Sequence, residues 1–363
     1  MVNIAILGYG NVGCGVAELI GRNADRIRNA AARPIQVKYI LDIRNFPDSP
    51  FADRMVKDFG VIERDPDIQI VVECIGGVKA AREFTQRALL AGKSVVTSNK
   101  ELVAEHGDEF LRLAREGNLN YLFEASVGGG IPIIRPISQC LAANRITEIC
   151  GILNGTSNFI LTAMRRAGSS FDTALAEARR LGYAELNPVD DINGMDVCRK
   201  ICILASLAFG RHIYPRLVSA EGMDGITAAD LSFAEENGLR IKLLGRAALL
   251  PDGKLAILAA PHLVPLSHPL STVDGVYNGI LVRGDAIGDV MFTGQGAGSL
   301  PTASAVTADV IDAAKHFHSR KYMDWEPCEE GFVTSADRLP CRWYTRPDGS
   351  RRFRILIDGE ATT

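Results

Sequence analysis

The acidic residues and the lysine between positions 185 and 200 are the part of the sequence best suited to chemistry. Glu185, Asp191 and Asp196 precede Lys200, and Lys200 opens the apolar segment 201–209. An ammonium group at the edge of a buried segment loses hydration, which is tolerable only if carboxylates compensate or the amine loses its proton. Asp196 lies one helical turn before Lys200, so both share a helix face. The segment predicts either an acid–base centre or an amphipathic helix with a charged entrance.

The N-terminal residues have the pattern of a turn that binds a dinucleotide. The aliphatic residues 3–7 predict a strand, and residues 16–20 have helical spacing. The residues between them that would contact a cofactor are Gly8, Gly10, Asn11, Val12 and Gly13. The first glycine permits a tight turn, the second lets the backbone approach a pyrophosphate, and the third lets the helix pack on the strand. The phosphates would lie at the helix N-terminus.

The second predicted strand, residues 35–42, ends near two residues that favour different cofactors. Asp42 would bind the ribose hydroxyls of NAD, whereas Arg44 could pair with the additional phosphate of NADP. Arg44 could also be a solvated loop charge, and the preceding segment 23–33 has the character of an insertion. We therefore favour NAD slightly and leave NADP open.

Strands, glycine turns and helices alternate further along the first part of the chain. The predicted elements are strands 68–74 and 94–97 and helices 82–91 and 101–116. This alternation is typical of an α/β fold with a doubly wound, Rossmann-type parallel sheet. Gly76 follows one strand, where the backbone can approach the dinucleotide, and Lys100 follows the next, where such sheets bind ligands. A surface role for Lys100 is disfavoured because cations are unfavourable at a helix N-terminus.

A loop with three consecutive glycines follows the next predicted strand, residues 120–127. These glycines leave main-chain carbonyls and amides uncovered, so the loop could enclose an ion or the edge of a cofactor. Glu124 would supply the one charge that an oxygen cage for a monovalent cation needs. A structural turn explains the same residues nearly as well.

The pattern changes from Arg135 onward, where strands and helices no longer alternate regularly. The predicted strands are 146–153, 241–250, 255–260, 276–283 and 290–293, the predicted helices are 159–166, 171–181 and 227–236, and 212–218 reads as extended. This pattern indicates an α+β domain with a mixed or antiparallel sheet. A second glycine-rich loop, which includes Gly298, opens another helix before residue 316.

These elements divide the chain into three parts. We expect a dinucleotide-binding domain at 1–130, with helix 299–316 returning to it. A second domain for substrate binding, catalysis and dimerisation is expected at 131–298. Residues 317–363 look like a C-terminal appendage with one hairpin, which is too small to form a domain.

The composition argues against several classes of function. A chain of 363 residues with 47% apolar residues is long enough for two domains, and its net charge of −3 does not indicate nucleic acid or a membrane surface as a partner. No apolar run reaches about 18 residues, and the chain opens with a strand rather than an export signal, so we expect a cytoplasmic protein. The eight cysteines lack Cys-x-x-Cys spacing and the six histidines are poorly placed to activate them, which argues against a thiol nucleophile.

Several stretches, in this order, resemble homoserine dehydrogenase over residues 1–316. They are Gly8–Gly13, Thr97–Lys100, Glu124–Pro132, Asn154–Asn158, Gly182–Lys200 and Gly296–Gly298. The resemblance implies a reversible, nicotinamide-dependent reduction of aspartate semialdehyde to homoserine, in threonine and methionine biosynthesis, by a homodimer formed through the sheet of the second domain. One common form of the family carries a threonine-binding regulatory domain after the catalytic part. Here one hairpin stands in that place, which puts feedback inhibition in doubt.

The resemblance also implies roles for individual residues. Lys200 would donate the proton to the carbonyl oxygen, and Lys100 would lie beside the nicotinamide and assist. The substrate, chiefly its ammonium group, would be held by Glu185, Asp191 and Asp196. The cofactor cleft would be lined by Gly182, Glu185 and Gly298. A sodium site would be formed by Glu124 and the carbonyls of Val127, Gly129 and Ile131.

Two alternatives stay open, one among enzymes and one outside them. A different two-domain dehydrogenase acting on an amino acid could use the same scaffold, and the first candidate is aspartate semialdehyde dehydrogenase. Aspartate semialdehyde dehydrogenase would need an active cysteine with a histidine and phosphate-binding arginines, and the sequence does not show that set. A nucleotide-sensing protein without turnover could keep the same fold. It would have no reason to retain Lys200 among acids.

Overall fold

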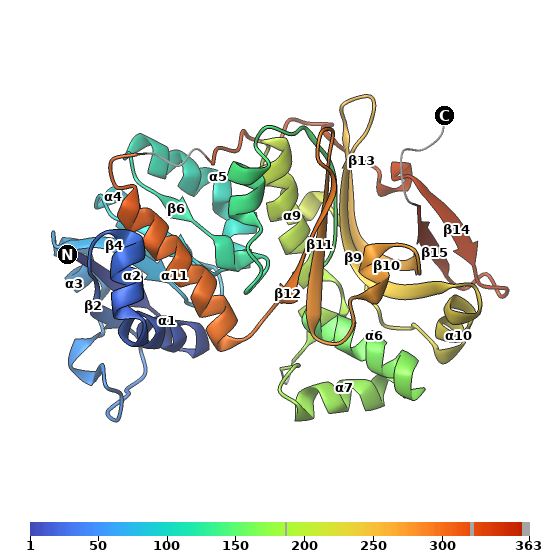
Figure 1. The fold of residues 1–363 in the computed structure, drawn as a ribbon, viewed down its shortest axis with the longest axis horizontal. Helices are drawn as coiled ribbons and strands as arrows, with labels where there is room; N and C mark the ends of the chain where they lie inside the picture. The colour runs from blue at the N-terminus through green and yellow to red at the C-terminus, as the bar shows by residue number, and fades with distance from the viewer. Residues whose placement is uncertain (186, 320–322, 358–363) are drawn as a thin grey trace. The chain divides into compact units, whose positions relative to one another are not determined.

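The computed structural model of the chain describes residues 1–185, 187–319 and 323–357. These residues form two compact units, which are coloured along the chain in Figure 1. Unit 1 comprises Met1–Ser138 and Ala297–Pro327, and unit 2 comprises Gln139–Gly296 and Cys328–Thr363. Among the described helices, none combines the length and apolar character needed to cross a membrane.

Unit 1 is built on a sheet of six parallel strands, as the alternating pattern predicted. The strands are β1 Val2–Leu7, β2 Ile35–Leu41, β3 Met55–Val56, β4 Ile68–Glu73, β5 Ser94–Thr97 and β6 Tyr121–Leu122. Their order is β3-β2-β1-β4-β5-β6, and each neighbouring pair is parallel. The strand order therefore reverses between β1 and β4, and ligands of such sheets bind at the carboxyl ends beside that point.

Helices pack on this sheet, and one of them comes from the far end of the sequence. The helices are α1 Asn11–Arg22, α2 Ala24–Ala31, α3 Phe59–Arg64, α4 Lys79–Leu90, α5 Lys100–Glu116 and α11 Ser299–Lys315. In Figure 1, α11 (orange) lies beside α1 and α2 (blue). A Cβ atom on Gly15 of α1 would lie 3.0 Å from the Cβ atom of Ala303 of α11. The two helices therefore approach each other closely because Gly15 lacks a side chain.

Segment 23–33, which reads as an insertion in the sequence, contains the helix α2, and only Ile27 and Ala31 on that helix are buried. One expectation for unit 1 was wrong in part. The predicted strand 120–127 ends at Leu122, and Glu124–Ser126 form a 3-10 turn. The apolar residues of that segment are buried in the turn, so their hydrophobicity alone did not distinguish it from a strand.

Unit 2 contains a mixed sheet of nine strands. The strands are β7 Ile146–Ile152, β8 Ser219–Ala220, β9 Leu239–Leu249, β10 Leu255–Pro265, β11 Tyr277–Gly284, β12 Gly288–Gln295, β13 Val333–Thr334, β14 Cys341–Thr345 and β15 Arg352–Leu356. The main order is β12-β11-β7-β9-β10-β15-β14, and β8 and β13 also pair with β10. The predicted C-terminal hairpin is present as β14 and β15, and β15 joins the sheet beside β10.

The helix that carries Lys200 packs tightly on this sheet. The helices of unit 2 are α6 Gly155–Ala167, α7 Phe171–Arg180, α8 Val189–Ile192, α9 Met195–Phe209 and α10 Ala228–Glu236. A Cβ atom on Gly245 of β9 would lie 2.9 Å from Ile201 Cβ and 3.1 Å from Val197 Cγ1 of α9. This close approach fixes α9 against β9. The expected extended segment 212–218 was wrong in part, because Pro215–Leu217 form a 3-10 turn.

Candidate active site

Lys200 lies in a buried position of unit 2, with two of its three N–H groups bound by the protein. Its side chain is on α9, and the residue is 8% exposed. Nζ lies 2.8 Å from Oδ2 of Asp196 and donates to the carbonyl oxygen of Leu153 at 2.7 Å. An ammonium group has three donors. Within the described part of the chain the third donor has no partner, so it is the one left for a ligand.

Asn154 links the two predicted acids that flank this lysine. Its Nδ2 donates to Asp191 Oδ1 at 2.7 Å and to Asp196 Oδ2 at 2.9 Å. The structure therefore brings Asp191, Asp196 and Lys200 together, as the sequence predicted. It does not bring Glu185 to them, because Glu185 is exposed and makes no hydrogen bond or ion pair with a described residue.

Glycines and a helix cap set the backbone around this cluster. Asn154 is the N-cap of α6, and its Oδ1 accepts the backbone N–H of Ser157 at 2.7 Å. Gly194 joins α8 to α9 with a φ of +84°, a conformation that glycine adopts without strain. Asn154 was not predicted to have a role of its own. The signal that could have found it is an N-cap residue directly after a buried strand.

The glycine turn of unit 1 has the geometry that a bound pyrophosphate needs. Gly8 has a φ of +92°, and a Cβ atom there would lie 2.7 Å from the carbonyl oxygen of Cys74. A Cβ atom on Gly13 would lie 1.9 Å from the carbonyl oxygen of Gly8. The N-cap of α1, Gly10, has no side chain to cover the N–H groups of the first helical turn. Asn11 and Val12 are the first two residues of that turn. Both are therefore placed to offer backbone donors to phosphate.

Asp42 and Arg44, which favoured different cofactors in the sequence, are paired at the end of β2. Arg44 donates to Asp42 through Nε at 3.1 Å and NH2 at 2.9 Å, and Tyr9 donates its backbone N–H at 2.7 Å. The side chain of Arg44 beside Asp42 holds the pKa of that carboxyl well below its usual value. Lys57 Nζ donates to the carbonyl oxygen of Asp42 at 2.9 Å. One cation therefore pairs with the carboxylate of Asp42, and a second binds the main chain of the same residue.

A buried acid, Glu73, ends β4 beside the turn that contains Gly76. Its carboxyl accepts the backbone N–H of Ile75 at 2.6 Å and the hydroxyl of Thr97 at 2.5 Å. Burial raises the pKa of Glu73 to about 7. This role was not predicted, because Glu73 lies near the end of the predicted apolar strand 68–74.

Asn99 connects the same turn to the helix that begins at Lys100. Its Nδ2 donates to the carbonyl oxygens of Ile75 at 3.1 Å and Gly77 at 2.7 Å, and its Oδ1 caps α5 by accepting the N–H of Leu102. Lys100 is half-buried at the start of α5. The side chain of Asn99 thus fixes both the turn around Gly76 and the start of α5, where Lys100 lies.

The loop expected to hold a cation uses its acid for another purpose. The carboxylate of Glu124 accepts the backbone N–H groups of Ile133 at 2.6 Å, Ile134 at 2.8 Å and Arg135 at 2.9 Å. The Glu124 carboxylate is therefore engaged with the main chain, and its expected part in an oxygen cage stays a prediction. The other expected ligands are the main-chain carbonyls of Val127, Gly129 and Ile131. Within the described chain, these carbonyls accept no backbone hydrogen bond. No cluster of three or more His, Cys, Asp or Glu side chains among the described residues could hold a metal.

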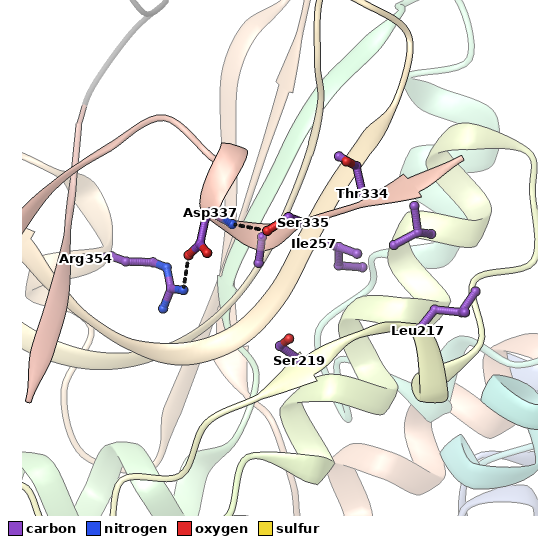
Figure 2. A pocket seen from close by; sticks show the side chains of 9 residues that line it. Leu217, Ser219, Ile257, Thr334, Ser335, Asp337 and Arg354 are labelled. Carbon is purple, nitrogen blue, oxygen red and sulfur yellow. Dashed lines mark hydrogen bonds and ion pairs between the residues drawn. The ribbon is translucent and has the colours of Figure 1, made fainter. Parts of the chain in front are cut away.

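Unit 2 also has a pocket of about 590 Å³ that contains none of these residues (Figure 2). It is lined by Leu217, Ser219, Ile257, Val333, Thr334, Ser335, Ala336, Asp337 and Arg354. Figure 2 shows Arg354 directed at Asp337, with 3.3 Å between NH2 and Oδ1. Arg354 also pairs with Glu221 at 2.7 Å. Its charge is compensated within the protein, so we assign the chemistry to the cluster around Lys200.

Comparison with known sequences gives a consistent result across the chain. The family model described as the homoserine dehydrogenase NAD-binding domain matches residues 8–124, and the model described as homoserine dehydrogenase matches residues 132–311. The homoserine dehydrogenase of Neisseria gonorrhoeae is 44% identical over 321 residues, which are 86% of this chain and 72% of that protein. The homoserine dehydrogenase of Synechocystis is 41% identical over 93% of this chain and 76% of that protein.

Comparison with solved structures finds the same family. The crystal structure of a homoserine dehydrogenase from Thiobacillus denitrificans has a TM-score of 0.83 and 41% identity, covering 88% of this chain and 75% of that chain. A hyperthermophilic archaeal homoserine dehydrogenase in complex with NADPH has a TM-score of 0.72 and 29% identity, covering 86% of this chain and 97% of that chain.

The raised pKa of Glu73 predicts a pH-dependent stability. Below pH 4.5 the carboxyl is protonated in the folded and the unfolded protein. Between pH 4.5 and about 7 the unfolded chain loses its proton first, so this group destabilises the folded state increasingly as the pH rises. Glu73→Gln removes that dependence. From pH 4.5 to 8, the unfolding free energy of the wild type should fall relative to the variant by on the order of 3 kcal/mol.

Urea unfolding at both pH values would measure this difference. Glu18→Gln, on the exposed face of α1, is the matched control and should show little pH-dependent difference from the wild type. A Glu73→Gln variant whose stability runs parallel to the wild type at every pH would contradict the assignment.

Proposed function

The chain belongs to the homoserine dehydrogenase family, and from this premise we propose how its residues share the reaction. The activity is the NAD(P)-dependent interconversion of L-aspartate 4-semialdehyde and L-homoserine, an oxidoreduction at a CH–OH group. When bound, the nicotinamide group supplies or accepts the hydride. The observation that carries the assignment of roles is the buried ammonium of Lys200, which is held by two protein acceptors and has one donor left. The comparisons do not favour aspartate semialdehyde dehydrogenase or a nucleotide sensor.

Lys200 is the proposed proton donor in the direction of reduction. Arrival of hydride at an aldehyde carbon leaves negative charge on the oxygen, so the site needs a cation that can also deliver a proton. The third N–H of Lys200 meets both needs, because Asp196 and the Leu153 carbonyl fix the direction of the other two. In the reverse direction the amine accepts the proton from the hydroxyl of homoserine. Lys100 is proposed to assist beside the nicotinamide.

Asp191 and Asp196 are the proposed binding groups for the ammonium of the substrate. Asp196 contacts Lys200, and Asp191 is joined to Asp196 through Asn154, so a substrate ammonium bound to both carboxylates would place a carbon chain near the amine. We propose Glu185 as a further contact of substrate and cofactor. It follows Gly182, whose φ of +76° turns the chain after α7.

The cofactor is proposed to bind along the carboxyl ends of the parallel strands in unit 1. The support is the cradle of Gly8 and Gly13, the uncapped first turn of α1 and the turn around Gly76. Gly298, with a φ of +123° directly before α11, is proposed as another contact in this unit. Together these positions offer backbone rather than side-chain donors to the phosphates.

Turnover is tested by mixing the protein with homoserine and NAD or NADP and following the absorbance of the reduced nicotinamide. Replacing Lys200 by Met should lower kcat about a hundredfold to ten-thousandfold, because the proton donor is lost, while the Kd for the cofactor stays unchanged. Lys254→Met, in the exposed turn between β9 and β10, is the matched control and should keep the wild-type rate. Near-normal turnover in Lys200→Met would remove Lys200 from the mechanism.

Arg44 is proposed to let the enzyme accept NADP. Its guanidinium group is 59% exposed, and with Lys57 it leaves the end of β2 with more positive than negative charge. Arg44→Ala should lower kcat/KM for NADP relative to NAD by about tenfold, because the phosphate loses a charged partner and Asp42 is released to bind ribose hydroxyls. Side-by-side rates with both cofactors measure this ratio. An unchanged ratio in Arg44→Ala, with Arg22→Ala as the control, would contradict the role.

A sodium ion is proposed in the loop after Glu124. Its ligands would be main-chain carbonyls, those of Glu124, Val127, Gly129 and Ile131, since the Glu124 carboxylate is bound to three N–H groups. Thermal unfolding in matched sodium and potassium chloride solutions tests this proposal. We expect a higher Tm in sodium, and equal values at every concentration would argue against a sodium site.

The cellular setting is a further part of the proposal. We propose a cytoplasmic enzyme of threonine and methionine biosynthesis, and eight cysteines that form no disulfide in the described chain agree with a reducing compartment. The homodimer implied by the resemblance stays a prediction, which light scattering after gel filtration would test.

A further inference from the structure

Asn154 makes contacts that the roles proposed above do not explain. The residue is 5% exposed at the start of α6. Because its Oδ1 accepts the N–H of Ser157, the side-chain amide is oriented with Nδ2 towards the acids. One amide group thus joins α6 to Asp191 of α8 and Asp196 of α9.

The charges around Asn154 require a donor at this point. Oδ2 of Asp196 accepts from both Nζ of Lys200 and Nδ2 of Asn154. Asp191 accepts from the same Nδ2, so the two carboxylates face one NH2 group, which has one N–H for each. Without that group two like charges would lie together with less compensation, and each would turn towards other donors.

On the basis of the proposed function, we infer that Asn154 is a positioning residue of the reaction. It holds Asp196 in contact with Lys200 and Asp191 beside them. The ammonium of the substrate and the reacting oxygen are thereby kept at fixed distances from the amine. Asn154 does not touch the reacting atoms, and its effect passes through the two carboxylates.

Two substitutions separate this role from that of a helix cap. Serine and aspartate are both good N-cap residues, so Asn154→Ser and Asn154→Asp keep the start of α6. Serine offers one donor on a shorter side chain. Aspartate has the shape of asparagine but brings a third carboxylate in place of the donor. We expect kcat/KM for homoserine to fall about tenfold or more in Asn154→Ser, and further in Asn154→Asp.

The kinetic constants distinguish positioning from loss of stability. A partly unfolded enzyme has fewer active molecules but unchanged Michaelis constants, whereas misplaced carboxylates raise KM for homoserine and leave KM for the cofactor unchanged. Ser170→Ala, which removes the exposed N-cap of α7, is the control for lost stability and should change neither constant. An unchanged KM and kcat for homoserine in both Asn154 variants would overturn the inference while the proposed function stands. A wild-type protein that does not oxidise homoserine would overturn both.

Discussion

The compensation of one buried ammonium group governs the arrangement of unit 2. Lys200 lies on a helix that packs closely against β9, since Gly245 has no side chain to hold Val197 and Ile201 away. Hydration is therefore replaced by protein acceptors, the carboxylate of Asp196 and the carbonyl of Leu153. The carbonyl of Leu153 and the side chain of Asn154 lie where β7 ends and α6 begins. The short helix α8 must pass the same place, because it carries Asp191. The position of the amine is a consequence of backbone geometry as much as of its carboxylate partners.

Unit 1 is arranged differently, because its glycine turn leaves main-chain groups open to an anionic ligand. Gly8 and Gly13 make that approach possible, and buried polar side chains fix the neighbouring turns. Glu73 and Asn99 bind main-chain groups on the turn after β4, and Asn99 also caps the helix that begins at Lys100. Side chains in this unit therefore shape the loops, while the donors for phosphate come from the main chain.

The sequence predicted the elements whose signals are local. The parallel sheet, the glycine turn after β1 and the grouping of Asp191, Asp196 and Lys200 follow from spacing that a single segment displays. Glu185 lies in the same segment, yet it is exposed, because spacing does not specify the direction of a turn. Asn154 and Glu73 were missed because their partners are distant in the chain. The amide contacts of Glu124 were also missed, since its three partners follow the glycine loop rather than lying in the strand pattern.

The return of α11 to the first sheet makes unit 1 discontinuous in the chain. Ala303, Val306, Val310 and Ala313 of this helix are fully buried within unit 1. During synthesis, the apolar surface that they cover has no partner until most of the chain has left the ribosome. The dinucleotide-binding half therefore completes its folding late, although it is translated first, and the sheet of unit 2 is completed later still, because β13 and β15 follow α11 in the chain.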